Sequence, residues 1–471
     1  MIFEDMEFSY YTEAEQKARR AYELYEDGKM SQALDELETA IAINPSNSSW
    51  HFNKGLTLDA VNRFRDAISE YEIALELNPN DPEILNSLAV DYTRTGQYDL
   101  AIDVFEQIEQ IDPQFEPCYC NRIITYTEME LHELAEQMFY LAQQVNPDCA
   151  LCYYNIGNSL FVRGEYKKAI RCWLKTAELE PGHPQINYRI AQAYWCDGDH
   201  ERARGHFLEE LRANPGDIDV ILDLGLFLLG SGEIDSAKEK FNRILELKPD
   251  SAAALFYAGE IALDNSEPEQ AEKLFNQALC MDNTLTGPRY RLAQCALMRA
   301  EKQKARDYLL AEMKLAPEDP DVLVSMGSML LKLDEVDCAI QCLLRVLDID
   351  SASSKGYYYL GLASVIDGRL DDAAEFFGHA LDLEPQHICA LRDSALVHLA
   401  MGKTGDAYEK ISMARALAGS DPQLKSLENR VRLAGVTEQV RDFFRRCRSG
   451  LFSFLPSGHR NPGSRNYEYR Q

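Results

Sequence analysis

Four cysteines are the residues of this chain whose types and spacing could support chemistry. Cys118 and Cys120 form one close pair, and Cys149 and Cys152 form a second pair with CxxC spacing. Cysteine thiolates can bind Zn²⁺ in a tetrahedral site, and a CxxC pair can also form a redox-active disulfide. The other reading is that cysteine replaces alanine as a small residue in helix packing. We expect packing, so no metal site is assigned, and we keep zinc and redox chemistry as the alternatives.

The rest of the sequence offers no catalytic pattern. The nine histidines show no metal-ligand spacing. His200 and His206, near Cys196, are expected on a turn and on a helix rather than at one site. No GxGxxG, P-loop, GxSxG or HExxH motif occurs. We therefore expect a protein that is not an enzyme and needs no cofactor.

Composition narrows the class of partner. The 471 residues carry a net charge of −29, which argues against nucleic-acid binding because phosphate contacts require a concentrated basic surface. The N-terminal residues lack the basic and apolar regions of a signal peptide, and no apolar stretch has the length of a transmembrane helix. The twelve cysteines are scattered, which fits a reducing compartment. We expect a soluble, cytoplasmic protein with neutral or basic partners.

The elements that must position these residues repeat with a fixed period. A proline series begins at Pro45 and is replaced only at Asn283, Ser351 and Gly419. An alanine recurs every 34 residues without interruption: Ala33, Ala67, Ala101, Ala135, Ala169, Ala203, Ala237, Ala271, Ala305, Ala339, Ala373 and Ala407. A fixed period of this size is typical of a solenoid. The sequence therefore predicts an all-α solenoid of twelve units over residues 14–421.

Each unit reads as two helices. In residues 48–81, apolar residues at helical spacing predict a first helix, a break follows near Asn62, and the spacing from Ala67 onward predicts a second helix. The eighth residue of eleven units is glycine or alanine. We expect this small residue to face the alanine of the second helix, so that the two helices approach closely. Large residues four positions after the alanine, such as Tyr71 and Trp173, should fill the space between units.

The combination of a small eighth residue, an alanine, a following aromatic residue and a closing proline resembles the tetratricopeptide repeat, a helix–turn–helix unit of 34 residues. The resemblance covers residues 14–421. It implies a right-handed superhelical α-solenoid whose concave groove is lined by the first helix of each unit and commonly binds extended peptides or partner helices. The array also resembles the repeat arm of O-GlcNAc transferases, without a catalytic domain, because Asn53, Asn121 and Asn155 form a partial asparagine ladder.

This resemblance implies that positions five, six and nine of the first helices face the groove. The groove residues so implied are Asn53, Asn121, Tyr154, Asn155, Asn158, Tyr188, Arg189, Phe256, Tyr290, Arg291 and Tyr358. Asparagine amides could hold a peptide main chain, the arginines could pair with a ligand carboxylate, and a set of exposed aromatic side chains is often a recognition surface. Packing between first helices is the alternative for the tyrosines.

The residues on either side of the repeats are predicted to form a lead-in, a cap and a tail. Residues 1–13 are expected to be a lead-in, and residues 422–447 a capping helix region, since the last unit of a solenoid needs a cover for its apolar face. Residues 448–471 are predicted to be a basic, disordered tail. The segment 441–471 holds seven arginines. We expect it to be solvated, and contact with an anionic membrane is the alternative.

The sequence thus favours a non-enzymatic scaffold that binds a peptide or a partner protein segment in the concave groove. One alternative is a substrate-recruiting subunit for a separate transferase, such as a protein glycosyltransferase. The other is a peripheral membrane adaptor that uses the basic tail.

Overall fold

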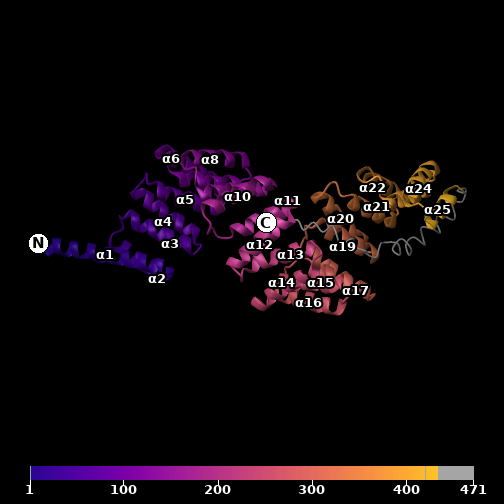
Figure 1. The fold of residues 1–471 in the computed structure, drawn as a ribbon, viewed down its shortest axis with the longest axis horizontal. Coiled ribbons are helices and arrows are strands. Elements are labelled where there is room, and N and C mark those ends of the chain that lie inside the picture. Colours follow the sequence, from indigo (N-terminus) through magenta and orange to yellow (C-terminus); the bar gives the residue numbers. More distant parts are fainter. Residues whose placement is uncertain (1, 420, 433–471) are drawn as a thin grey trace. The chain divides into compact units, whose positions relative to one another are not determined.

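The computed structural model describes residues 2–419 and 421–432, and every regular element in them is a helix (Figure 1). The described part divides into two compact units, with unit 1 ending at Val220 and unit 2 beginning at Ile221. Within each unit, helices that follow one another in the chain pack against each other. The all-α, helix-pair solenoid predicted from the period is therefore confirmed.

The helices of unit 1 are α1 (Ile2–Glu26), α2 (Met30–Ile43), α3 (Ser48–Ala60), α4 (Phe64–Leu77), α5 (Pro82–Arg94), α6 (Tyr98–Ile111), α7 (Glu116–Glu128), α8 (His132–Val145), α9 (Ala150–Val162), α10 (Tyr166–Leu179), α11 (Ile186–Asp197) and α12 (His200–Ala213). Helix α13 (Ile218–Gly230) contains the boundary between the units. Unit 2 continues with α14 (Ile234–Leu247), α15 (Ala252–Asp264), α16 (Pro268–Met281), α17 (Pro288–Met298), α18 (Lys302–Met313), α19 (Pro320–Lys332), α20 (Val336–Ile349), α21 (Ser354–Asp367), α22 (Leu370–Leu383), α23 (Ile388–Ala400), α24 (Thr404–Ala418) and α25 (Pro422–Arg432).

The even-numbered helices reproduce the sequence period. From Met30 of α2 to Thr404 of α24, each begins 34 residues after the previous one. Caps set some of the intervening starts: the Asp81 carboxylate accepts the backbone N–H groups of Glu83 and Ile84, and Pro82 occupies the first turn of α5. An aspartate followed by proline is a favourable helix start, because it satisfies free N–H groups and needs no donor at the first position.

The turn inside each helix pair has one residue in the left-handed region, and this residue also recurs every 34 positions. Seven of these residues are glycines: Gly28, Gly96, Gly164, Gly198, Gly232, Gly368 and Gly402. The other five are Asn62, Glu130, Ser266, Ala300 and Asp334. Glycine adopts this conformation at no steric cost, whereas a residue with a Cβ atom is strained there. The packing of the two helices therefore imposes the turn even where no glycine supplies it.

The close contact within each helix pair differs in one respect from expectation. Where the eighth residue of a unit is glycine, the atoms nearest to its missing side chain belong to the large residue four positions after the alanine, and not to the alanine. A Cβ atom added at Gly157 would lie 2.5 Å from Trp173, and one added at Gly361 would lie 2.5 Å from Phe377. Both rings have 0% exposure. At these two places the glycine thus makes room for a buried ring.

Both ends of the array carry helix beyond the predicted units. Helix α1 starts at Ile2, so it includes residues that were expected to be a lead-in. At the other end α25 packs against α24 and buries Leu424, Leu427 and Val431, as the predicted cap requires. The remainder of the predicted cap region, to 447, and the basic segment 441–471 lie outside the described residues.

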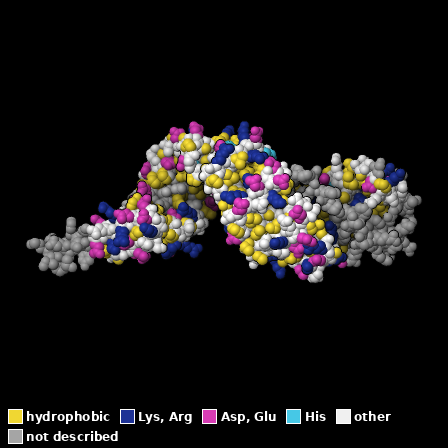
Figure 2. All heavy atoms as spheres, turned by 60° about the horizontal axis from the view of Figure 1, so that its bottom comes forward, with side chains coloured by type: hydrophobic (Ala, Val, Ile, Leu, Met, Phe, Trp, Pro, Cys, Tyr) yellow, Lys and Arg dark blue, Asp and Glu magenta, His cyan; other side chains and the backbone are white. Residues whose placement is uncertain are grey.

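The surface is mixed in character. On the face shown in Figure 2, acidic, basic and hydrophobic side chains are interspersed. Across residues 2–419 and 421–432, none of the helices combines the length and the hydrophobicity that crossing a bilayer requires.

The ring-over-glycine contact predicts opposite effects for two glycine-to-alanine substitutions in neighbouring helices. Gly361→Ala should lower the free energy of unfolding by about 1–3 kcal/mol, because the new methyl group has to displace the buried Phe377 ring. Gly378→Ala, in α22, adds a Cβ atom that meets nothing within 4 Å, so it should stabilise by about 0.5–1 kcal/mol. Urea unfolding of both variants checks this, and equal changes would contradict it.

Candidate functional site

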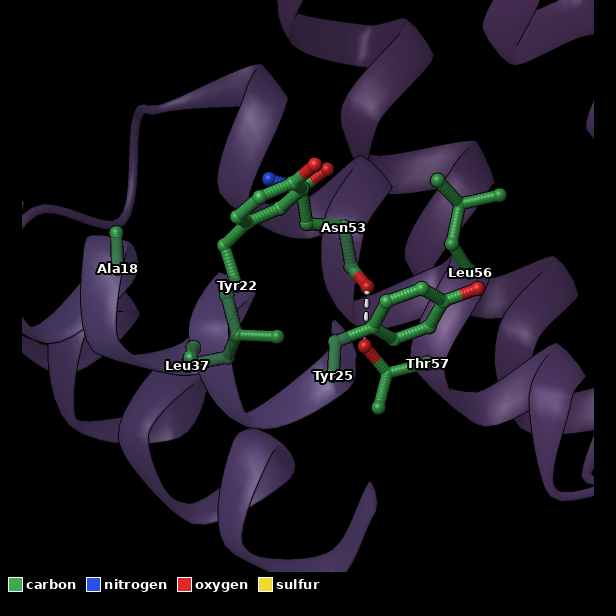
Figure 3. Close-up of a pocket in the computed structure, with 8 residues that line it drawn as sticks. Ala18, Tyr22, Tyr25, Leu37, Asn53, Leu56 and Thr57 are labelled. Carbon is green, nitrogen blue, oxygen red and sulfur yellow. Dashed lines mark hydrogen bonds between the residues drawn. The ribbon is translucent and has the colours of Figure 1, made fainter. Parts of the chain in front are cut away.

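A hollow lies among the helices at the N-terminal end of unit 1 (Figure 3). It has an empty volume of about 360 Å³ and is open to solvent. Its lining comes from the first helices α1 and α3 and from α2: Ala18, Ala21, Tyr22, Tyr25, Leu37, Asn53, Leu56 and Thr57. Of the predicted groove residues, Asn53 is the one that lines this hollow.

The hollow combines an apolar lining with polar groups at a few points. Tyr22 is 62% exposed, and Tyr25 and Leu56 are half-buried. The Thr57 hydroxyl donates to the Asn53 carbonyl oxygen at 2.7 Å, the dashed line in Figure 3. The Asn53 side-chain amide makes no hydrogen bond within the part of the chain that the structure describes. An apolar recess with one uncommitted amide can accept a hydrophobic side chain and hydrogen-bond the main chain beside it.

The other asparagines of the predicted ladder bond to the neighbouring first helix. Asn121 Nδ2 donates to Asn86 Oδ1 at 2.9 Å, and Asn155 Nδ2 donates to the Cys120 carbonyl oxygen at 3.1 Å. Asn155 is buried, whereas Asn121 and Asn158 are half-buried. The donor groups of Asn121 and Asn155 thus tie consecutive units together, so they are committed within the chain.

Most of the predicted aromatic residues are packing residues. Tyr188, Tyr290 and Tyr358 are buried, and the Tyr358 hydroxyl donates to Asp393 Oδ2 at 2.9 Å. The packing alternative therefore describes these three tyrosines. Tyr154 and Phe256 are half-buried. The Tyr154 ring is tilted by 33° against the His183 ring, with 4.4 Å between the ring centroids.

The two predicted arginines differ. Arg189 is half-buried, and its Nη1 donates to Gln192 Oε1 at 3.4 Å. Arg291 is buried in unit 2, with Nε 2.5 Å from Glu260 Oε1 and its guanidinium carbon 4.8 Å from the centre of the Tyr290 ring. Burial lowers the pKa of Arg291, but Glu260 and Tyr290 raise it above the ordinary arginine value. Arg291 is committed to Glu260, so it is not the open carboxylate-binding group that the sequence suggested.

The cysteines gather into a tighter group than the sequence frame indicated, and its membership differs. Cys120, Cys149 and Cys152 lie together with Glu116, and Cys120 and Cys152 form a disulfide. Cys118 points elsewhere: its thiol donates to the Phe105 carbonyl oxygen at 3.4 Å, and burial raises its pKa to about 12.

Sequence reasoning placed Cys118 in this group and missed Glu116. The available signal was the spacing of Glu116 and Cys120, which are four residues apart and so share one face of a helix.

Comparison with known proteins gives one family and several distant structures. The model of the tetratricopeptide repeat family matches residues 54–114, 154–218 and 222–284. No curated protein matches the chain in sequence.

Three solved structures illustrate the distant likeness. The APC/C hetero-tetramer Cut9–Hcn1 is 13% identical, with 87% of this chain and 95% of that chain covered and a TM-score of 0.44. Yeast Tom70 is 14% identical (93% and 98% covered, TM-score 0.38). A thermophilic repeat protein from Thermus thermophilus, TTC0263, is 24% identical (39% and 99% covered, TM-score 0.36).

The buried Arg291–Glu260 pair predicts a large stability effect. Glu260→Gln should lower the free energy of unfolding by about 3 kcal/mol, because it leaves a buried guanidinium without its counter-charge. The matched control is Asp321→Asn, whose partner Lys355 lies 3.1 Å away on the surface. That change should cost less than about 1 kcal/mol. Thermal unfolding of both variants tests the difference, and comparable losses would show that the buried pair is not special.

Proposed function

We propose that this chain, a tetratricopeptide repeat protein, is a non-enzymatic scaffold that binds an extended segment of a partner protein on the first helices of unit 1. The hollow lined by Tyr22, Leu56 and Asn53 carries the proposal. Because α3 supplies both an apolar wall and an uncommitted amide, this hollow can hold one side chain and one peptide group of the same ligand.

The chemistry of the hollow indicates the chemistry of the ligand. Its lining is mainly aliphatic and aromatic, so the anchoring side chain should be apolar. The exposed Tyr22 ring offers a large contact area and can also hydrogen-bond through its hydroxyl, a combination that is common at protein interfaces. The net charge of −29 favours basic residues on either side of the anchor. The expected partner segment is therefore extended and basic, with an apolar anchor.

The predicted groove residues take different parts in this proposal. Asn53 would contact the ligand, and the half-buried Asn121, Tyr154, Asn158, Arg189 and Phe256 are candidates for further contacts. The buried Asn155, Tyr188, Tyr290, Arg291 and Tyr358 would act by fixing the positions of the helices. This division follows from burial, because a side chain that is closed off by its own chain cannot touch a peptide.

The sequence also predicts two other roles and a cellular location. A substrate-recruiting role for a separate transferase would be a special case of the same peptide binding. A membrane-adaptor role depends on residues 441–471, which lie outside the described residues. The cytoplasmic location stays a prediction from composition.

Peptide selection tests the proposal directly. A random peptide library displayed on phage would be selected on the full chain, and the enriched peptides synthesised. Leu56→Arg and Tyr22→Ala should each weaken their binding at least about tenfold, a loss of about 1.4 kcal/mol. Fluorescence anisotropy measures the dissociation constants.

Tyr140→Ala supplies the matched control. Tyr140 lies on the second helix α8 and is 60% exposed, close to the 62% of Tyr22, and its removal should leave binding unchanged. Selection that yields no binding peptide, or equal losses for Tyr22→Ala and Tyr140→Ala, would overturn the proposal.

A further inference from the structure

Three cysteines and one glutamate of unit 1 bring four potential metal ligands together. Sγ atoms of Cys120, Cys149 and Cys152 and a carboxylate oxygen of Glu116 all lie within 4.8 Å of one another. Cys120 Sγ is 3.5 Å from Cys149 Sγ. Glu116 Oε1 is 2.9 Å from Cys120 Sγ and 3.2 Å from Cys152 Sγ. We call these four residues the thiol cluster.

The repeat architecture holds the thiol cluster in place. Glu116 and Cys120 lie one turn apart on α7, and Cys152 lies in the first turn of α9, the first helix of the next unit. Cys149 precedes α9 as its N-cap, and its sulfur accepts the backbone N–H of Cys152 at 3.2 Å. Because α7 and α9 pack against each other, none of these ligands depends on a long loop.

We propose that the thiol cluster binds one Zn²⁺ when its cysteines are reduced, through Cys120, Cys149, Cys152 and Glu116. In the oxidised chain, the Cys120–Cys152 disulfide occupies two of the four ligands and excludes the metal. The cluster would thus be a zinc site controlled by thiol oxidation. This role is independent of peptide binding at Tyr22 and Asn53.

The distances suit a tetrahedral site. Zn²⁺ bound by thiolate at about 2.3 Å and by carboxylate at about 2.0 Å keeps its ligand atoms roughly 3.5–3.8 Å apart. Cys120 Sγ and Cys149 Sγ already have such a separation, 3.5 Å. Glu116 Oε1 lies 2.9 Å from Cys120 Sγ and 3.2 Å from Cys152 Sγ, so it would move slightly outward on metal binding. Reduction would have to part Cys120 Sγ from Cys152 Sγ, and all four ligand atoms already lie within 4.8 Å of one another.

A structural disulfide alone does not account for the group. Disulfide sulfurs have no proton to donate, so within the cluster the Cys149 thiol is then the one donor to the Glu116 carboxylate. A thiol is a weak donor and compensates a half-buried carboxylate only in part. A Zn²⁺ ion would supply the positive charge and would use Glu116 and Cys149, the two members that the disulfide leaves out.

A thiol–disulfide relay explains the group less well. Such a relay uses the three cysteines and gives no part to Glu116, whose Oε1 lies 2.9 Å from Cys120 Sγ and 3.2 Å from Cys152 Sγ.

A dithiol can reduce the Cys120–Cys152 disulfide and so open the site to Zn²⁺. The reductant gives two electrons and two protons to the Cys120–Cys152 bond and itself becomes a disulfide, leaving two thiols on the chain. Zn²⁺ then displaces the three thiol protons to solvent and is held by three thiolates and one carboxylate. Oxidation by a small disulfide runs the sequence backwards and releases the ion. Entry is from the side of Glu116, which is half-buried while the three sulfurs are buried.

Metal binding by the full chain tests the proposal. The protein would be reduced with a dithiol, freed of reductant without oxygen, and titrated with Zn²⁺ and separately with Co²⁺. We expect one ion per chain by elemental analysis, and for Co²⁺ the visible bands of tetrahedral thiolate coordination. After oxidation with glutathione disulfide, binding should fall to zero and mass spectrometry should find the Cys120–Cys152 pair.

Matched variants locate the site. Cys149→Ser should abolish stoichiometric binding, and Glu116→Gln should weaken it at least about tenfold. Cys172→Ser, at a free half-buried cysteine on α10 outside the cluster, should bind as the wild type does. Circular dichroism establishes that each variant is folded. If a variant does not fold, the Co²⁺ spectrum of the reduced wild type still tests the proposal.

Reduced wild type that binds neither ion would overturn the proposal. So would Cys149→Ser with an unchanged stoichiometry, or an oxidised chain that still holds its metal.

Discussion

Everything in this structure depends on the close approach of the two helices of a pair, where in most pairs a glycine or alanine of the first helix lies beneath a large apolar side chain of the second. Gly157 under Trp173 and Gly361 under Phe377 are two examples. This contact sets the distance between paired helices, and the pairs stack so that each meets only its neighbours. The first helices are thereby held in a row, which places the hollow at α1 and α3 and the thiol cluster at α7 and α9.

The sequence was sufficient for the parts that depend on spacing alone. The alanine period predicted where the helices would begin, because no insertion shifts the register between Met30 and Thr404. The Asp81 cap was also readable, since capping needs only nearby residues. The direction in which long side chains point could not be read from the sequence. Tyr358 reaches Asp393 and Arg291 reaches Glu260, and such partners, more than thirty residues away in these cases, cannot be inferred from the repeat frame.

The thiol cluster is a second case in which the repeat frame does not predict which side chains meet. Cys118 and Cys152 hold equivalent positions in consecutive units, so equivalence alone suggested that they would meet. In the structure, Cys118 turns toward α6 and hydrogen-bonds to Phe105, whereas Cys120, about half a turn later, faces α9. Residues at equivalent positions of two units point in the same direction, so they do not face each other. The contact between α7 and α9 instead joins Cys120 to Cys152, which hold different positions in their units. Glu116 joins the group because it lies one turn before Cys120 on the same face of α7.

The left-handed turns have a mechanical consequence. Glycines accept this conformation freely, but Ser266, Ala300 and Asp334 adopt it in three consecutive helix pairs of unit 2. Each such residue costs about 1–2 kcal/mol relative to glycine, so strain accumulates in one stretch of the array. In a chain whose units are coupled only to their neighbours, the most strained stretch opens first. Under tension, the array would yield in its interior between α15 and α20 and not only by fraying from its ends.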